Sequence, residues 1–193
     1  MAEGRPAPDR TVLARPGRGS TRARLAEILR VDHAGELAAV HIYRGQQAVF
    51  SAAAGKASLG EAFAELRAQE AEHLEAFDAL LAERGVRPSL LTPVWRAAAF
   101  ALGAGTALLG DKAAHACTDA VEEVIGEHYA GQIEELKDRE PALAEQLSAF
   151  REDELRHQAD AVRVGARQAA GYGPLSALIK AGCRAAIRTA EKI

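Results

Sequence analysis

Residues 31–46, VDHAGELAAVHIYRGQ, decide the fold of this chain, because their pattern predicts a long helix and places an acid on its apolar side. Steps of three or four residues from Leu29 to Phe50 trace one stripe of the kind that faces a helical core, and Glu36 lies in its middle. An ionised carboxylate alone in a core is prohibitively costly. Glu36 must therefore be protonated, paired or bound to a cation.

The same pattern returns in the second half of the chain, where YRGQ is echoed by YAGQ. A Glu is followed by a Tyr and then a Gln at fixed spacing in two places: Glu36, Tyr43 and Gln46, and Glu122, Tyr129 and Gln132. Each copy is followed, 34 and 32 residues after its glutamate, by a Glu-x-x-His motif: Glu70 with His73, and Glu154 with His157. Glu-x-x-His alone is weak evidence. The shared register, however, indicates a tandem repeat of one helical hairpin.

The composition predicts an all-α protein. Ala, Leu, Glu and Arg dominate the 193 residues, aromatic residues make up 5%, and no segment has the pattern of a strand. A formal net charge of −3 gives no reason to expect nucleic acid as a main partner. Cys117 and Cys183 are too few and too far apart for a disulfide framework, so we expect buried thiols in a reducing compartment.

Two regions are expected along the chain. Residues 1–21 are rich in Arg, Pro and Gly and have no secretory signal, which predicts a disordered basic tail. An Arg-rich start also suits a mitochondrial transit peptide, although Pro and Gly oppose the amphipathic helix that such a peptide needs. Residues 22–193 are expected to form one folded domain.

Start and stop signals predict four long helices, at about residues 21–54, 58–84, 111–137 and 141–169, and a last helix at about 175–191. Ser58 and Glu61 have capping-box spacing at the start of the second helix, and Gly85 suits its end. Two short connections and one long crossover at residues 85–110 predict a ferritin-like four-helix bundle with an apolar crossover helix and an extra C-terminal helix.

The crossover is the most apolar stretch of the chain, and Trp95 and Arg96 near its start are residues that a membrane interface favours. It contains too short an uncharged run to span a bilayer. The last helix carries basic residues four apart on one face: Lys180, Arg184 and Arg188. We interpret residues 89–110 and 175–191 as membrane-interfacial helices; packing over the bundle and an ordinary surface helix are the alternatives.

The repeat places a Glu from each of two helices, and a Glu-x-x-His from each of the other two, at comparable depth. This is the ligand set of the di-iron and di-manganese carboxylate bundles, and four carboxylates offset two divalent ions. We predict Glu70 and Glu154 as bridging ligands, because each can reach across to both metals. The predicted terminal ligands are Glu36 and His73 for one metal, and Glu122 and His157 for the other.

Several polar residues are expected near these ligands. Asp32 and Asp119, one turn before Glu36 and Glu122, are candidate acceptors for the second ring proton of the ligating histidines. For Asp153, acceptor and solvated neighbour are equal alternatives.

Tyr43 and Tyr129 lie two turns beyond the ligands of their helices. They are expected either to form hydrogen bonds or conduct electrons near the metals, or to be ordinary core residues. His128, beside Tyr129, is a candidate for handling protons, with a structural role as its alternative. The remaining histidines have no identifiable partner: His33, His41 and His115.

Four segments of the chain resemble the demethoxyubiquinone hydroxylase family of ubiquinone biosynthesis: RVDHAGELAAVHIYRGQ at 30–46, FALGAGTALLG at 100–110, ACTDAVEEVIGEHYAGQIEEL at 116–136 and IKAGCRAAI at 179–187. The resemblance runs from about residue 22 to the C-terminus. It implies that the six predicted ligands match the iron ligands of that family. It also implies that Tyr129 and His128 match positions used near the site for electron or proton delivery.

The resemblance implies a di-iron monooxygenase with two Fe ions. It would hydroxylate a polyprenylated methoxy-methyl benzoquinol at its unsubstituted carbon, with dioxygen and two external electrons. A polyprenyl substrate is dissolved in the bilayer, so the resemblance implies peripheral membrane contact. The expected location is the cytoplasmic face of a bacterial inner membrane, and the alternative is the matrix side of the mitochondrial inner membrane. A lipid-binding auxiliary protein, the electron donor and the oligomeric state are left open.

Two alternatives use the same bundle. A ferritin- or rubrerythrin-like ferroxidase or peroxidase is the enzymatic one, although the sequence has no Cys-x-x-Cys module of the rubrerythrin kind and neither enzyme needs an apolar crossover. A membrane-associated metal-binding scaffold without a substrate pocket is the non-enzymatic one.

Overall fold

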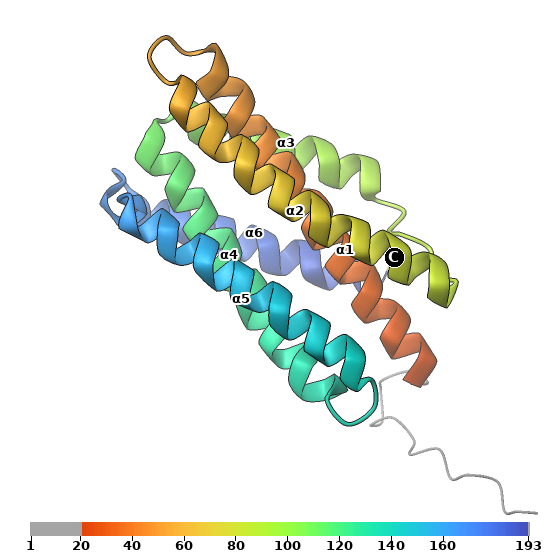
Figure 1. Ribbon diagram of the computed structural model, residues 1–193. Helices are drawn as coiled ribbons and strands as arrows, with labels where there is room; N and C mark the ends of the chain where they lie inside the picture. Colours follow the sequence, from red (N-terminus) through yellow and green to blue (C-terminus); the bar gives the residue numbers. More distant parts are fainter. Residues whose placement is uncertain (1–20, 193) are drawn as a thin grey trace, which may run out of the picture.

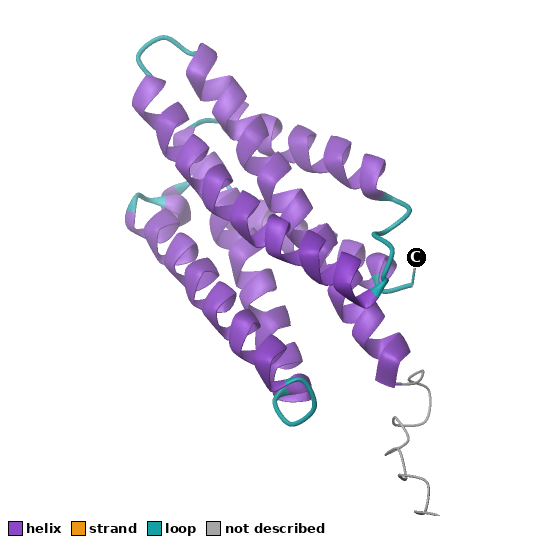
Figure 2. Ribbon diagram, turned by 45° about the vertical axis from the view of Figure 1, so that its right-hand side comes forward, coloured by secondary structure: helices purple, strands orange, loops and turns teal. Residues whose placement is uncertain are grey.

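The computed structural model describes residues 21–192, and all regular elements in this range are helical (Figures 1 and 2). The helices are α1 Thr21–Ala52, α2 Ala57–Arg84, α3 Thr92–Leu108, α4 Asp111–Leu136, α5 Pro141–Arg163 and α6 Tyr172–Ala190, with a 3-10 turn at Ala166–Gln168. The predicted tail falls, apart from Thr21, outside the described residues.

Two predictions about helix ends differ from the structure, and a third agrees with it. α5 ends at Arg163 rather than near residue 169, because Gly165 adopts a left-handed conformation with a φ of 103° and a 3-10 turn follows. The capping box of Ser58 and Glu61 does not form, since the N-cap of α2 is Lys56 and no side chain caps it. Gly85 does end α2, with a φ of 64°.

The predicted ferritin-like bundle is confirmed. α1 packs against α2 and α4 against α5, and these two antiparallel pairs lie next to each other (Figure 1). α3 packs on α1, and α6 packs on α4. The repeated unit is therefore larger than the hairpin seen in the sequence, because each hairpin is followed by a third helix that covers its first one.

Two glycines, Gly103 on α3 and Gly45 on α1, explain how closely these helices approach each other. A Cβ atom on Gly103 would lie 1.9 Å from the carbonyl oxygen of Ile42, and one on Gly45 would lie 2.4 Å from that of Phe100. The inner face of α3 is thus part of the protein core, while Val94, Phe100 and Leu108 on the same helix are exposed. None of the described helices is both long and apolar enough to cross a bilayer.

The contact between α1 and α3 can be tested at Gly103. A Gly103→Ala substitution places a methyl group against the α1 backbone, and we expect it to cost about 1–3 kcal/mol of stability, as overpacking usually does. Gly105→Ala in the same helix is the control, because a Cβ there meets nothing within 4 Å. Thermal unfolding followed by circular dichroism should show a lower Tm for the first variant alone. Equal Tm values for both would show that this close approach does not hold α3.

Candidate metal centre

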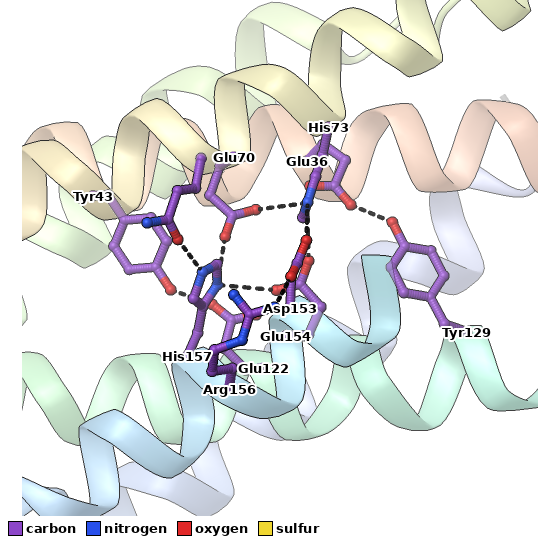
Figure 3. Close-up of polar contacts among 11 residues, drawn as sticks. Glu36, Tyr43, Glu70, His73, Glu122, Tyr129, Asp153, Glu154, Arg156 and His157 are labelled. Atoms are coloured by element: carbon purple, nitrogen blue, oxygen red, sulfur yellow. Dashed lines mark hydrogen bonds and ion pairs between the residues drawn. The ribbon is translucent and has the colours of Figure 1, made fainter. Parts of the chain in front are cut away.

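Four glutamates from four helices meet in the middle of the bundle (Figure 3). Each lies in a core-facing stripe, and each has an exposed fraction of 0%. They are Glu36 on α1, Glu70 on α2, Glu122 on α4 and Glu154 on α5. His73 and His157 are also buried, each one turn after the glutamate of α2 or α5.

These six residues form two overlapping clusters, in each of which one ligand atom per residue lies within 4.8 Å of the others. The first cluster comprises Glu36, Glu70, His73 and Glu154, and the second comprises Glu70, Glu122, Glu154 and His157. Glu70 and Glu154 therefore belong to both. The structure brings together all six residues that the sequence singled out, in the grouping expected for two shared and four terminal ligands.

The shared glutamates present one oxygen to each histidine. Glu70 places Oε1 2.9 Å from Nδ1 of His157 and Oε2 3.7 Å from Nδ1 of His73. Glu154 places Oε1 3.2 Å from Nδ1 of His73 and Oε2 3.5 Å from Nδ1 of His157. Both carboxylates thus span the two clusters.

Hydrogen bonding leaves particular atoms of this centre without a partner. Both oxygens of Glu70 and of Glu154 are buried without a hydrogen bond, whereas Glu36 and Glu122 each leave only Oε2 unpaired. In both histidines the unpaired atom is Nδ1. Buried polar atoms are rarely left unsatisfied in proteins. Two free oxygens on each shared glutamate and one on each terminal glutamate match the donors needed by a pair of bridged metal ions.

The outer nitrogens of the histidines have acceptors on neighbouring helices. Nε2 of His73 lies 3.2 Å from Oδ2 of Asp153, and Nε2 of His157 lies 2.7 Å from Oε1 of Gln69. These bonds leave each Nδ1 directed at the glutamates. Gln69 was missed in the sequence, although it and Asp153 share a signal: each directly precedes the glutamate of a Glu-x-x-His motif.

The prediction that Asp32 and Asp119 serve the histidines is wrong. Asp32 accepts a 2.7 Å hydrogen bond from the Gln132 amide. Asp119 accepts hydrogen bonds from three residues outside the centre: Gln158, Arg167 and Tyr172. It therefore anchors the segment that leads into α6. Asp32 and Asp119 lie on α1 and α4, whereas the outer nitrogen of each histidine faces the other helix of the α2 and α5 pair.

The two tyrosines hold the terminal glutamates in a crossed arrangement. Tyr43 of α1 donates a hydrogen bond to Oε1 of Glu122 on α4, and Tyr129 of α4 donates one to Oε1 of Glu36 on α1. Figure 3 shows the two rings at opposite ends of the cluster. Both side chains are fully buried. Each tyrosine therefore fixes one oxygen of a glutamate and leaves the other directed inward.

The other histidines lie outside the two clusters. His128 is half-buried, with Nε2 2.9 Å from the Gln132 amide nitrogen and 3.6 Å from Oδ1 of Asp32. It also lines a shallow surface pocket, so it lies between Asp32 and solvent. Among the remaining three, His33 bonds to Asp78, His41 to its own helix, and His115 stacks on Phe63.

Burial determines how these acids ionise. Desolvation, together with the negative charge of neighbouring carboxylates, raises the pKa of Glu70 and Glu122 well above the usual range, and desolvation raises that of Glu36. Burial also opposes ionisation of Glu154, but its close contacts with His157 and His73 outweigh burial and lower its pKa to about 2. His73 is desolvated too, yet its close contacts with Glu154 and Glu36 raise its pKa to about 10.

The donor set fits divalent metal ions. Four carboxylates and two imidazoles are the ligands that iron, manganese and zinc accept, and both clusters are fully buried. Within the described part of the chain, no Lys or Arg forms an ion pair with any of the four glutamates. Metal ions would neutralise this charge and would also give a partner to the unpaired atoms of the centre.

An apolar cavity of about 430 Å³ lies between α1 and α4, with α3 and α6 as its other walls. Its walls include Gly35 and Val121, the residues directly before Glu36 and Glu122. Gly35 and Gly182 face it with open space where a Cβ would be, so packing does not require glycine at either position. The cavity thus runs beside the two helix segments that carry the terminal glutamates.

Residues 23–190 match the protein family described as ubiquinone biosynthesis protein COQ7. The 3-demethoxyubiquinol 3-hydroxylase of Rhodospirillum rubrum is 47% identical, over 92% of this chain and 82% of that protein. The human mitochondrial NADPH-dependent 3-demethoxyubiquinone 3-hydroxylase is 44% identical, over 90% of this chain and 80% of its own length. The mitochondrial 5-demethoxyubiquinone hydroxylase of Saccharomyces cerevisiae is 41% identical, over 88% and 78%.

The pKa shifts predict how pH changes the stability of the metal-free chain. Because their pKa values are raised, Glu36, Glu70 and Glu122 keep their protons to a higher pH in the folded state than in the unfolded chain, whose carboxyl pKa is 4.5, and His73 keeps its proton up to about 10 instead of 6.5. Since the folded state binds more protons, stability falls as pH rises from about 6 to about 8. Each such proton changes the free energy of unfolding by about 1.4 kcal/mol per pH unit, or ~3–6 °C in Tm.

The low pKa of Glu154 acts in the opposite direction, but only below pH 4.5, outside this window. Excess Mn²⁺ should reverse the trend, because the ion replaces the protons and binds better as pH rises. Thermal unfolding at both pH values, with and without Mn²⁺, checks this. The same slope in both conditions would contradict metal binding at these acids.

Proposed function

This chain belongs to the family of ubiquinone biosynthesis protein COQ7, and we propose that it is a di-iron monooxygenase that hydroxylates a polyprenylated demethoxyubiquinol with dioxygen. The family resemblance seen in the sequence is thereby confirmed. The proposed ligands of the two Fe ions are Glu36, Glu70, His73, Glu122, Glu154 and His157. One observation carries the proposal: the buried carboxylate–histidine centre lies beside a large apolar cavity.

The cavity suits the apolar part of such a substrate. Its walls are almost wholly aliphatic, with Trp95 on α3 and Leu178 and Ile187 on α6. A polyprenyl chain gains about 0.8 kcal/mol for each CH₂ group that leaves water, so this lining favours its entry. The ring would enter first and come to rest against the helix segments of Glu36 and Glu122, where hydroxylation takes place.

The chain's own residues would hold and shield the centre. Tyr43 and Tyr129 keep Glu122 and Glu36 in place through their hydrogen bonds, and the aromatic and aliphatic core around them excludes water. Two ferrous ions would supply electrons to dioxygen, of which one oxygen atom enters the ring and the other leaves as water with two protons and two external electrons.

His128 and Tyr129 are the residues that we propose for delivery of protons or electrons. His128 is half-buried beside a surface pocket and lies 3.6 Å from the buried carboxylate of Asp32. Tyr129, the next residue, donates its hydroxyl hydrogen bond to Glu36. His128 thus lies on the surface side of Asp32, one turn before Glu36 on α1, and Tyr129 contacts Glu36 directly from the core. Tyr43 has the equivalent contact to Glu122 and is proposed for the same role in the other half.

We propose peripheral membrane contact through the two helices that wall the cavity. Exposed apolar side chains occur on α3, on its flanks and on α6: Leu90, Val94, Phe100, Leu108, Leu109 and Leu178. Lys180 and Arg184 on α6 form ion pairs with Glu123 and Glu127 of α4. These two basic residues therefore hold α6 against the bundle. The relatives come from a bacterium and from mitochondria, which suits the inner membrane of either. A lipid-binding auxiliary protein remains a prediction of the sequence.

The alternative functions account for less of the structure. A ferroxidase or peroxidase, or a metal-binding scaffold, would use the same ligands but has no use for an apolar cavity of this size beside them. The hydroxylase proposal uses both features.

The ligand assignment is tested by Glu154→Ala. Loss of one of the shared carboxylates should lower hydroxylation by more than about 100-fold, beyond the 10–100-fold typical of outer partners of a metal site, and should lower bound iron. The matched control is Glu152→Ala, an exposed acid two residues away. Product formation by mass spectrometry, iron by elemental analysis and helicity by circular dichroism separate a lost site from a lost fold. Full activity in Glu154→Ala excludes the assignment.

The cavity is tested by Gly182→Leu. The new side chain would fill space that the polyprenyl chain is proposed to occupy, so we expect KM for a long-chain substrate to rise by at least about 10-fold, the equivalent of ~1.4 kcal/mol. Iron content should be unchanged. Gly173→Leu, on the same helix but outside the cavity and free of close neighbours, is the control. Unchanged KM in both variants would place the substrate elsewhere.

A further inference from the structure

Among the six proposed ligands and the residues that form hydrogen bonds with them, the two halves of the metal centre differ in one pair of residues. The residue before the glutamate of each Glu-x-x-His motif is Gln69 in α2 and Asp153 in α5. Each serves the histidine of the other helix: His157 bonds to Gln69 at 2.7 Å, and His73 bonds to Asp153 at 3.2 Å. One histidine thus faces a neutral amide and the other a carboxylate.

The other hydrogen bonds of the ligands repeat between the halves. Each half supplies one terminal glutamate held by a tyrosine of the other half, one shared glutamate with two unpaired oxygens, and one histidine with an unpaired Nδ1. Among these hydrogen bonds, the two metal positions therefore differ in the acceptors of the histidines.

The surroundings of the two acceptors also favour Asp153 as the stronger acceptor. Asp153 is about one third exposed and uses its second oxygen, Oδ1, in an ion pair with Arg156 that holds the carboxylate in place. The corresponding position of α2 is Glu72, which offers no such cation. Gln69 is exposed, so water competes with His157 for its amide oxygen. The Gln69 contact is the shorter of the two, but the carboxylate of Asp153 is the charged acceptor and the one held by an ion pair.

An acceptor of this kind changes how strongly an imidazole binds a metal. When Nδ1 is the ligand atom, Nε2 keeps its proton and donates it to the acceptor. A carboxylate makes that bond charge-assisted and increases the electron density of the ring, which strengthens the bond between metal and histidine. A neutral amide does this less. The expected difference is the 10–100-fold in metal affinity that outer partners of metal sites typically contribute.

We propose that the two metal positions are inequivalent, and that the position formed by Glu36 and His73 takes its divalent ion first because Asp153 supports His73 more strongly than Gln69 supports His157. This inference rests on the proposed metal centre. Asp153 and Gln69 are positioning residues that act through the histidines, and they set the order in which the centre assembles.

The test is a titration of the metal-free full chain with Mn²⁺. We expect two calorimetric steps, the first tighter by about 10-fold or more. At one equivalent, electron paramagnetic resonance should show mostly isolated Mn²⁺. Anomalous diffraction from crystals at the same loading should place the ion beside His73.

Three variants test whether Asp153 and Gln69 cause the difference between the two metal positions. Asp153→Gln gives both histidines an amide, so the first step should weaken by about 10-fold and the ion should divide between the positions. Gln69→Asp gives both a carboxylate, so the second step should tighten. The double variant Gln69→Asp/Asp153→Gln should move the first ion to His157. Glu152→Gln, which removes a nearby exposed acid without touching a histidine, is the control and should leave both steps unchanged.

The failures of the two proposals are distinguishable. Absence of Mn²⁺ uptake by the wild-type chain refutes the proposed metal centre itself. Uptake in one cooperative step that no variant divides, a first ion beside His157 in the wild type, or a double variant that fills as the wild type does would each overturn the inference and leave the metal centre standing.

Discussion

Four glutamate side chains meet in the centre of this bundle without exposed surface, and an ionised carboxylate in such a place costs several kcal/mol unless it is compensated. The described part of the chain compensates them only in part, with two tyrosine hydroxyls and two histidines, and leaves six carboxylate oxygens and two imidazole nitrogens unpaired. A pair of divalent ions would satisfy these atoms together. Among the described residues no Lys or Arg pairs with these glutamates, and this is the observation behind the proposed metal binding.

The repeat determines what surrounds this centre. Each three-helix unit contributes a hairpin that carries half of the acids and a third helix that covers the first, and the two units exchange contacts: Tyr43 reaches Glu122, and Tyr129 reaches Glu36. α3 and α6 are added outside the bundle, where they enclose an apolar cavity against α1 and α4. The cavity thus lies along the α1 and α4 side of the centre, while the α2 and α5 side holds the histidines and their acceptors.

The sequence was sufficient for the features that depend on periodicity within one helix. The core-facing stripes placed Glu36 and its three counterparts inward, and the register of Glu70 and Glu154 predicted which acids lie between the two clusters. It was insufficient where two helices meet. The acceptor of His157 is supplied by α2, so position along α5 could not reveal Gln69, whereas Asp153 was already one of two open alternatives. The cavity depends on small residues of α1, α3 and α6, among them Gly35 and Gly182, that look unremarkable singly.

Proton release on metal binding tests the central claim most directly. If the glutamates are buried because cations neutralise them, anaerobic titration of the metal-free chain with Fe²⁺ near neutral pH should bind about two ions per chain and release protons, since burial raises the pKa of Glu70 and Glu122 well above the usual range while the metal is absent. Calorimetry in buffers of different ionisation enthalpy measures both quantities in one experiment. Binding of fewer than one ion per chain, or binding of two without proton release, would contradict the account.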